Sequence, residues 1–312
     1  MRYFIMGGTG FVGRHLVEKI LAGGDQAVLL VRPGSEPPAA KGLETITGNP
    51  FQAGAWAGKA RSCDVVVNLV GSTIMTRWTA KARERIMATR VDSTRAAVQA
   101  LGKEGTKTLL CANAIGFYGD GGDHEQTENT PAGTGFLAEI CQAWQKEAEK
   151  AKNIGHRVCI MRFGAVLGPG GGALAKMLPP FRLGLGGPVG GGRQWFSWVH
   201  VQDVAEAIQF LAGEKSAQGV FNICAPDPVR NREFALALGR VLNRPAFLPF
   251  PGWVLRLAMG QASDVVLASQ RCLPRRLQDA GFRFSQPSLV QALADIVNEQ
   301  ARGKTRSRRN GR

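Results

Sequence analysis

The sequence is poor in the residues that most often identify an active site. It has two tyrosines and four histidines in 312 residues, and its six cysteines form no C-x-x-C pair and no compact cluster with histidine. Structural metal sites need such closely spaced thiol and imidazole ligands. We therefore expect reduced, buried thiols and no metal site.

Long apolar runs are also missing. No run approaches the roughly 18 to 20 residues that a helix needs to span a bilayer, and Met1 leads directly into a strand pattern rather than a signal peptide. With 44% hydrophobic and 20% charged residues, the chain can bury one large core, or a large and a small one. We expect a soluble cytoplasmic protein without a membrane span, as a monomer or homodimer.

Acidic residues are scarcer than basic ones. Lysine and arginine number 39 against 24 aspartates and glutamates, which gives a net charge of +15. Six basic residues lie in the terminal segment "RGKTRSRRNGR" (302–312), so the rest of the chain carries +9, which is 15 less 6. This composition is typical of a disordered, solvated tail. Counterion release would give weak binding to polyanions, but no nucleic-acid-binding motif accompanies it, so we expect no specific nucleic-acid partner.

Short β-branched apolar runs alternate with helical patterns in the first half of the chain. The spacing predicts helices at about 11–22, 78–101 and 133–153. It predicts strands at the runs "RYFIM", "AVLLVR", "ETIT", "CDVVVNLV", "KTLLCAN" and "RVCIMRF". Such alternation is typical of an α/β protein with a doubly wound parallel sheet of the Rossmann type. We expect this fold, with a smaller, mostly helical C-terminal lobe.

The composition changes at a segment rich in glycine and proline, 168–194, whose apolar residues distinguish it from a flexible linker. The predicted organisation is a Rossmann domain at 1–165, to which 196–225 returns, a glycine-rich cap loop at 166–195, a C-terminal substrate lobe at 226–300 and a basic disordered tail at 301–312.

The segment "YFIMGGTGFVGRHLVEKIL" places three glycines at G-x-x-G-x-x-G spacing, directly after an apolar strand and at the start of a helix. Glycine lets the backbone turn tightly and approach a pyrophosphate, and the free amides of the helix N-terminus bind its charge. The fourth strand ends in "NLVG" at the same edge of the sheet, where Asn68 could instead only tie backbone segments together. The predicted cofactor contacts are Gly7, Thr9, Gly10, Phe11, Val12, Gly13, Asn68, Val70 and Gly71.

The second strand ends in Arg32, where an NAD site usually has an acidic residue that accepts a hydrogen bond from the ribose 2'-hydroxyl. A guanidinium at this position suits a 2'-phosphate. The sequence therefore predicts NADP(H), preferred over NAD(H), with Arg32 among the cofactor contacts. The alternative is that Arg32 is merely solvated.

Several segments resemble a single superfamily. "GGTGFVG", "NLVG", "FYGD" and "WVHVQDVAEAI" are similar to motifs of the extended short-chain dehydrogenase/reductases, which include nucleotide-sugar epimerases and dehydratases. Longer segments, among them "MRFGAVLGPGGGALAKMLPPFRLGLGGPVGGGRQWFSWVHVQD" and "LASQRCLPRRLQDAGFRF", resemble an atypical branch of epimerase family proteins with a C-terminal domain of unknown function. The resemblance runs from Met1 to about Ile296. It implies a Rossmann core, bound NADP(H) and a small C-terminal lobe, but no particular substrate.

The resemblance also exposes a missing acid. Ordinary members of the superfamily use a tyrosine as acid, a lysine four residues later that lowers its pKa, and a serine or threonine that holds the reacting oxygen. Alignment of "FLAEICQAWQKEAEK" places Ile140 and Trp144 at the tyrosine and lysine positions, and Asn113 or Ala114 falls at the serine. Tyr118 is the one tyrosine near this site, so Tyr118 and Asn113 are the catalytic candidates. The alternative is that Tyr118 only packs in its turn.

Basic residues near the site could bind an anionic substrate group. Arg77 lies in a basic segment before the predicted helix at 78–101, Arg162 ends a strand, and Arg193 lies in the glycine-rich segment. We predict these three as substrate contacts. The alternative for the helix segment is a solvated basic face.

The leading hypothesis is an NADP(H)-binding oxidoreductase that acts on an unidentified carbonyl or sugar-like small molecule, with an anionic substrate as one option. The alternatives are a noncatalytic NADP(H)-binding redox sensor or assembly protein, and a nucleotide-sugar epimerase. An epimerase must move protons at the oxidised carbon, so the missing tyrosine and lysine count against it. Whether the chain is an enzyme stays open at this point.

Overall fold

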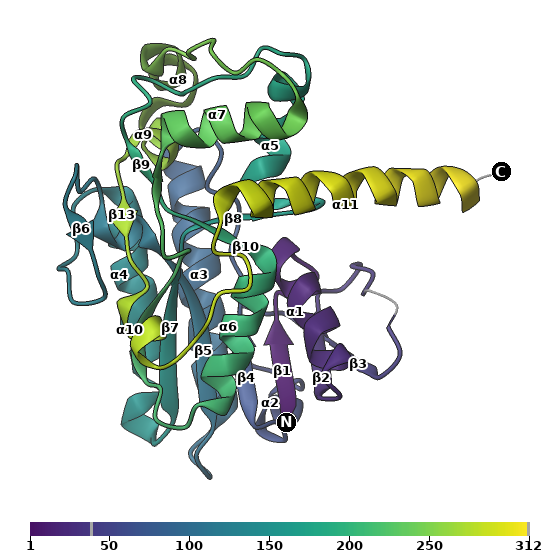
Figure 1. The fold of residues 1–312 in the computed structure, drawn as a ribbon. Coiled ribbons are helices and arrows are strands. Elements are labelled where there is room, and N and C mark those ends of the chain that lie inside the picture. Colours follow the sequence, from purple (N-terminus) through teal and green to yellow (C-terminus); the bar gives the residue numbers. More distant parts are fainter. Residues whose placement is uncertain (38–39, 311–312) are drawn as a thin grey trace.

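A parallel sheet with helices on both faces forms the larger part of the molecule, and a mostly helical region covers one end of it in this computed structural model (Figure 1). The structure describes residues 1–37 and 40–310, with side chains to residue 301. The sheet order is β11-β7-β5-β4-β1-β2-β3, and all its pairs are parallel. This order is that of a doubly wound Rossmann sheet, which confirms the predicted fold class. The strands are β1 (Arg2–Met6), β2 (Gln26–Val31), β3 (Leu43–Thr47), β4 (Val65–Asn68), β5 (Thr108–Ala114), β7 (Arg157–Phe163) and β11 (Gly219–Ile223).

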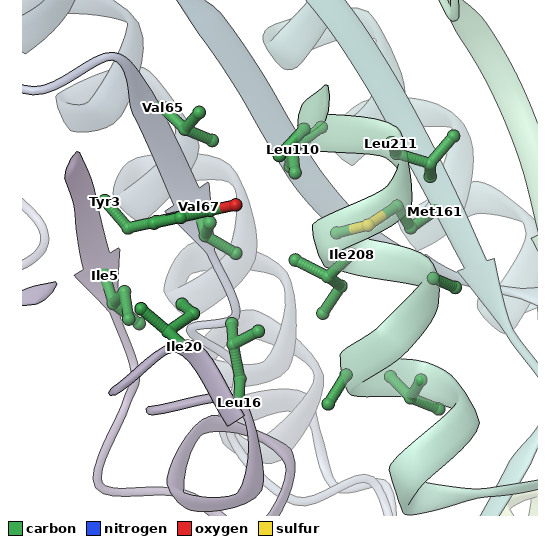
Figure 2. Close-up of a cluster of buried hydrophobic side chains, with 14 of the residues drawn as sticks. Tyr3, Ile5, Leu16, Ile20, Val65, Val67, Leu110, Met161, Ile208 and Leu211 are labelled. Carbon is green, nitrogen blue, oxygen red and sulfur yellow. The ribbon is translucent and has the colours of Figure 1, made fainter. Parts of the chain in front are cut away.

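Both faces of the sheet are buried, because successive strand residues point to opposite sides. Tyr3 and Ile5 belong to the core under α1 (Phe11–Ala22) and α6 (Val201–Gly213) (Figure 2). The intervening residues of β1 belong to a second core on the other face. That core is covered by α2 (Ala57–Arg61), α3 (Ala80–Leu101) and α4 (Phe136–Glu149).

The residues that precede the helices determine where the helices begin. Helix α3 begins at Ala80 because the Thr79 hydroxyl accepts a hydrogen bond from the Ala82 amide, 3.2 Å away. Helix α4 is shorter than the predicted 133–153. Gly135 has φ of 90°, so the chain enters the helix only at Phe136. The helix predicted at 11–22 has the observed limits of α1.

The C-terminal lobe has a core of its own. It is built by α5 (Gly172–Arg182), α7 (Asn231–Leu242) and α11 (Leu289–Asn310), whose buried residues include Leu178, Phe234 and Leu293. The segment predicted as a cap loop at 166–195 thus contains a helix, because Leu174, Leu178 and Phe181 recur at helical spacing and are buried. The predicted domain limits themselves stay a prediction.

Shorter elements join the lobe to the sheet. Two-stranded pairs are formed by β8 with β10, β9 with β12, and β6 with β13. Their limits and those of the remaining helices are β6 (Glu125–Gln126), β8 (Ala165–Gly168), β9 (Trp195–Phe196), β10 (Trp198–His200), β12 (Val229–Arg230), β13 (Arg271–Cys272), α8 (Gly252–Met259), α9 (Asp264–Leu267) and α10 (Arg275–Asp279), with 3-10 turns η1 (Ile115–Tyr118), η2 (Lys152–Ile154) and η3 (Gly260–Ser263).

Helix α11 extends away from the body of the molecule and its backbone is helical to Asn310 (Figure 1). The predicted basic disordered tail falls here, and its side chains from residue 302 onward lie outside the described residues. Within the described chain, no helix is both long enough and apolar enough to cross a bilayer.

Candidate cofactor and active site

A cleft of about 210 Å³ lies at the carboxyl ends of β1, β2 and β4. Six of the predicted cofactor residues line it: Gly7, Thr9, Gly10, Arg32, Val70 and Gly71. Sequence reasoning missed Phe51, which follows β3, and Thr89 of α3. The position of Phe51 after the third strand was the available signal, since all parallel strands end at the same edge.

The first turn of α1 is prepared for an anion. Gly7 has φ of 84°, and its carbonyl accepts a hydrogen bond of 3.0 Å from the Gly10 amide, which closes the turn. A Cβ atom on Gly13 would lie 2.4 Å from both the Gly7 oxygen and the Gly8 Cα atom, so the helix can approach the turn this closely only with glycine there. No side chain caps the helix at Gly10. Its first amides are therefore available to a pyrophosphate, and the loop fits a dinucleotide.

Arg32 follows β2 at the rim of the cleft, and its side chain is exposed. No residue in the described part of the chain pairs with its guanidinium. A guanidinium presents five N–H donors in a planar fork that matches phosphate oxygens. The geometry at this rim therefore fits a negatively charged group.

Asn68 is fully buried and its side chain is occupied within the protein. Its Nδ2 donates to the hydroxyls of Ser93 and Thr94, at 3.3 Å and 3.0 Å, and its Oδ1 accepts from the Val70 amide at 3.1 Å. It therefore acts on the cleft by holding Val70 in the wall. This is the second of the two roles that the sequence left open for Asn68.

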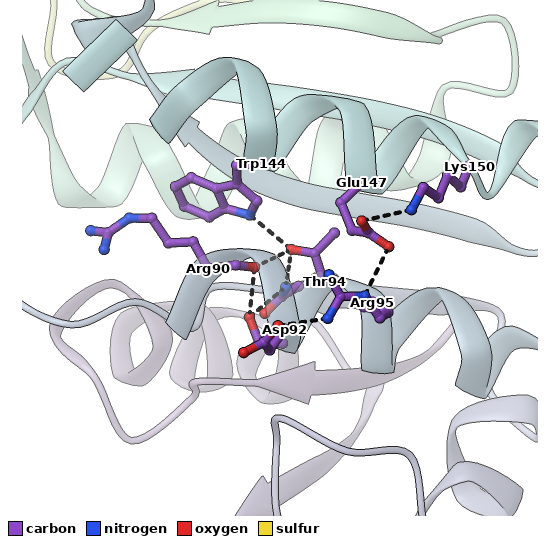
Figure 3. A network of polar contacts seen from close by, with 9 residues as sticks. Arg90, Asp92, Thr94, Arg95, Trp144, Glu147 and Lys150 are labelled. Atoms are coloured by element: carbon purple, nitrogen blue, oxygen red, sulfur yellow. Dashed lines mark hydrogen bonds and ion pairs between the residues drawn. The ribbon is translucent and has the colours of Figure 1, made fainter. Parts of the chain in front are cut away.

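Trp144, at the position aligned with the superfamily lysine, is a neutral and fully bonded side chain. Its Nε1 donates to the Thr94 hydroxyl at 2.8 Å, and that hydroxyl donates to the Arg90 carbonyl at 2.7 Å (Figure 3). Thr94 thus joins α4, α3 and, through Asn68, β4. The indole ties these elements together and supplies no charge.

A cation from a different helix lies beside this indole. The Arg90 guanidinium is 5.3 Å from the centre of the Trp144 ring, and it donates to the carbonyls of Ser72 and Ile86, both at 3.0 Å. Burial lowers its pKa from the ordinary value, and no carboxylate among the described residues forms an ion pair with it. Since Ser72 lines the cleft, Arg90 places an unneutralised cation directly behind the cleft wall.

Tyr118 is buried in η1 rather than open to the cleft. Its hydroxyl donates to Asn222 Oδ1 at 2.7 Å and accepts from Arg162 Nη1 at 2.8 Å. Burial raises the pKa of this hydroxyl above its ordinary value, although the nearby Arg162 cation acts in the opposite direction. These contacts favour the packing role for Tyr118, and its catalytic role stays a prediction.

Arg162 is only 2% exposed and forms no ion pair with any residue that the structure describes. Its Nη2 donates to Gln145 Oε1 at 2.9 Å, and its guanidinium carbon lies 3.4 Å from the centre of the Phe117 ring. Its Nε has no partner. A buried cation held by neutral groups and aromatic faces is costly to keep, which sets Arg162 apart from ordinary core residues.

Asn113 is likewise directed into the protein. Its Nδ2 donates to the Cys141 carbonyl at 3.0 Å, and its Oδ1 accepts from the Ala114 amide at 2.8 Å. Burial raises the pKa of the Cys141 thiol to about 11, so it stays protonated at neutral pH. Asn113 therefore fixes the end of β5 against α4, and its predicted catalytic role has no support beyond position.

The three arginines predicted to bind substrate are not joined by any contact. Arg162 is buried at the end of β7, whereas Arg77 and Arg193 are exposed on separate connecting segments. Sequence reasoning missed Arg83, whose guanidinium carbon lies 4.4 Å from the centre of the Phe136 ring and which donates to Gln261 in η3. This contact joins the start of α3 to the C-terminal lobe.

The glycine-rich segment packs directly against the cofactor loop. A Cβ atom on Gly171 would lie 2.3 Å from the ring of Phe11, and one on Gly172 would lie 2.7 Å from the same ring. Phe11, predicted to contact the cofactor, is therefore also the residue on which the chain between β8 and α5 rests. The glycines are needed there because the ring occupies the space of any side chain.

Two polar residues of "WVHVQD" are buried at the joint with the lobe. Asp203 accepts hydrogen bonds from the backbone amides of Ser285, at 2.7 Å, and Gln286, at 3.2 Å, while burial raises its pKa to about 6. Burial lowers the pKa of His200 to about 4. Their positions fit a structural hinge.

All six cysteines are buried and unpaired, and the described residues contain no cluster suited to a metal ion.

Family models match most of the chain. Residues 3–224 match the NAD dependent epimerase/dehydratase family, and residues 250–296 match a domain of unknown function, DUF1731. Among curated proteins, the chloroplastic epimerase family protein SDR39U1 homolog of Arabidopsis thaliana is 36% identical, over 95% of this chain and 87% of that protein. The epimerase family protein SA0724 of Staphylococcus aureus is 35% identical, over 96% of this chain and 99% of that protein.

Solved structures agree with this assignment. The crystal structure of human epimerase family protein SDR39U1 (isoform 2) with NADPH superposes with a TM-score of 0.83 at 31% identity, and covers 96% of this chain and 99% of that chain. MoeE5 in complex with UDP-glucuronic acid and NAD has a TM-score of 0.81 at 20% identity, covering 97% and 100% of the two chains, which shows a shared fold.

Proposed function

Because the chain belongs to the NAD dependent epimerase/dehydratase family, we propose that it is an NADP(H)-dependent oxidoreductase for a small carbonyl or sugar-like substrate. The observation that carries the cofactor choice is the unpaired, exposed guanidinium of Arg32 at the end of β2. A similar protein, human SDR39U1, was crystallised with NADPH. Both facts favour a cofactor with a 2'-phosphate.

The cofactor residues have separate tasks in this proposal. The amides at the start of α1 bind the pyrophosphate, Arg32 binds the 2'-phosphate, and Val70 and Gly71 line the cleft beside it. A nicotinamide held there would supply the hydride chemistry. Arg90, behind the wall at Ser72, contributes positive potential to the site.

The proton donor and the substrate contacts are assigned to fewer residues than the cofactor contacts are. The proton comes from Tyr118, once its hydroxyl is released from Asn222, or from water. Arg77 and Arg193 are exposed and free to contact an anionic substrate group. Asn113 holds the end of β5, which carries the turn that contains Tyr118.

The cofactor claim is tested by measuring Kd for NADPH and NADH in the native protein and in Arg32→Ala. We expect NADPH to bind the native protein more tightly, and Arg32→Ala to weaken NADPH about 10- to 100-fold while leaving NADH unchanged, because only NADPH carries the 2'-phosphate. Arg85→Ala, an exposed arginine on α3, is the matched control and should leave both constants unchanged. Equal affinities of the native protein for the two cofactors would contradict the proposal.

A noncatalytic NADP(H)-binding sensor or assembly protein is the second candidate. It is favoured by one specific observation, that the aligned acid and lysine positions hold Ile140 and Trp144 while the Tyr118 hydroxyl is paired in the interior. The same observation counts against a nucleotide-sugar epimerase. Purified protein with NADPH and a panel of aldehydes, ketones and oxidised sugars separates the first two candidates. NADPH oxidation by any of them supports the oxidoreductase, and tight NADPH binding without oxidation supports the sensor.

A further inference from the structure

The end of the C-terminal lobe has an apolar face that the described chain leaves uncovered. Two segments form it, the connection after α5 and the segment from Phe247 through α8, and they run side by side. The Gly190 amide donates to the Phe250 carbonyl and the Phe250 amide donates to the Pro188 carbonyl, both at 2.8 Å. We define the lobe face by its exposed side chains Leu183, Leu185, Phe247, Phe250, Trp253 and Leu257.

Helix α8 shows how unusual this face is. It contains no buried residue, and Trp253 and Leu257 are 69% and 74% exposed. These two residues are four positions apart, so they lie on one side of the helix, and Arg256 lies on the same side. Monomeric proteins rarely gather large apolar side chains on an exposed surface unless the surface binds something.

The two stretches of sequence that contribute the lobe face contain basic residues and no acidic residue. No aspartate or glutamate occurs from Gly168 to Gln202 or from Phe234 to Ser263, whereas each stretch contains three basic residues. Those residues are exposed in both stretches, and none forms an ion pair with a described residue. They are Lys176, Arg182, Arg193, Arg240, Arg244 and Arg256.

This combination selects one kind of occupant. A second copy of the chain would place arginines against arginines, and such a like-charge contact is unfavourable. An anionic surface with an apolar interior matches both features, because tryptophan and arginine favour the interface of a bilayer, where the ring lies among the headgroups and the cation meets lipid phosphates. In Figure 1, α8 lies at the far end of the molecule from the N-terminus.

We propose that the lobe face is a docking surface for a phospholipid bilayer that contains anionic lipids. The protein associates with the membrane through the two segments that form this face, the second of which contains α8. This inference is independent of whether the cofactor site is catalytic.

Flotation of the full chain with lipid vesicles tests the proposal. The vesicles contain phosphatidylcholine alone or with about one-third phosphatidylglycerol. We expect binding only to the anionic vesicles, and binding that weakens with added salt. Trp253→Ser with Leu257→Ser should lower the partition coefficient about tenfold, because two apolar anchors are lost. Arg256→Gln should lower it about fivefold.

Matched controls exclude general effects on folding and charge. Val290→Ser removes an exposed apolar residue from α11, and Lys215→Gln removes an exposed cation from the turn before β11, so neither should change the partition coefficient. Circular dichroism and thermal unfolding check that each variant is folded, and we expect each to be so because Trp253, Arg256 and Leu257 are exposed.

Three outcomes would overturn the proposal. The first is equal binding of the native protein and the Trp253→Ser, Leu257→Ser variant. The second is loss of binding only when the basic segment 302–312 is deleted, which would assign binding to the tail. The third is a dimer that dissociates in the Trp253→Ser, Leu257→Ser variant while no vesicles bind, which would make a second copy the occupant.

Discussion

The two halves of the sheet edge treat their polar groups in opposite ways. At the ends of β1 and β2, no side chain caps the start of α1, and Arg32 lines the cleft with a guanidinium that has no partner within the described protein. At the ends of β5 and β7, the side chains of Asn113 and Tyr118 are paired inward with residues of other elements. The first half is therefore built to receive a ligand, and the second is built to hold its own structure.

This difference separates the residues that we propose for cofactor binding from those that we propose for catalysis. The backbone of the first half needs only glycine and a helix start, so its function survives changes elsewhere. In the second half, Ile140 and Trp144 stand at the positions aligned with the superfamily tyrosine and lysine, and the Trp144 indole donates a hydrogen bond to Thr94 of α3. Arg162 is also paired inward through its two Nη atoms, but its Nε has no partner among the described residues.

The largest expected effect is at Gly13, where α1 packs against the turn at Gly7. Gly13→Ala places a Cβ atom 2.4 Å from the Gly7 oxygen, so α1 must move away from the turn. We expect the free energy of unfolding to fall by about 3 kcal/mol and Kd for NADPH to rise at least about 100-fold. Chemical denaturation and a binding titration measure the two. Gly58→Ala in α2 is the control, since nothing lies within 4 Å of its added Cβ.

A smaller effect, of opposite sign, is expected at Arg162. Arg162→Met removes a buried cation that has no carboxylate partner and fills its volume with an apolar chain. We expect the free energy of unfolding to rise by about 2 kcal/mol, because the cost of desolvating the charge disappears. Denaturant unfolding gives the answer. A fall of similar size would mean that Arg162 is retained for its bonds to Tyr118 and Gln145, and would remove the reason to assign it to substrate.

The smallest effect is expected at Tyr118. Tyr118→Phe leaves Asn222 Oδ1 and Arg162 Nη1 without this partner in the interior, so we expect the free energy of unfolding to fall by about 1 kcal/mol. The Kd for NADPH should not change. Once a substrate is found, kcat decides between the two roles of Tyr118: an unchanged kcat assigns the hydroxyl to structure, and a loss of about 100-fold or more assigns it to proton transfer.

The sequence signals that predicted residues of the cleft are local. The glycine spacing, the following helix and the arginine after β2 all lie within the first 32 residues. The side-chain pairing at the ends of β5 and β7 could not be predicted in the same way. Tyr118 and its partner Asn222 are 104 residues apart, and Trp144 and Thr94 are 50 apart. Only the folded sheet brings these pairs together. Local sequence patterns therefore could not show that the Tyr118 hydroxyl is paired, and Tyr118 stayed a candidate acid.

The same limit applies to the lobe. Glycine and proline between 166 and 195 predicted a loop, but α5 forms there because Leu174, Leu178 and Phe181 bury one helical face among α7 and α11. Pro179 and Pro180 lie inside this helix. Burial of the apolar face therefore outweighs the low helix propensity of proline and glycine in this segment. Amino-acid composition alone could not show this burial.

The contact of Phe11 with Gly171 and Gly172 limits how this protein can be recombined. The ring belongs to the nucleotide-binding loop and the glycines belong to the entry into the lobe, so neither half is a free-standing module. A chimera that takes its lobe from a relative must bring small residues at these two positions, or a smaller residue at position 11. A chimera should therefore not be joined between β8 and α5, although the amino-acid composition of the chain changes there.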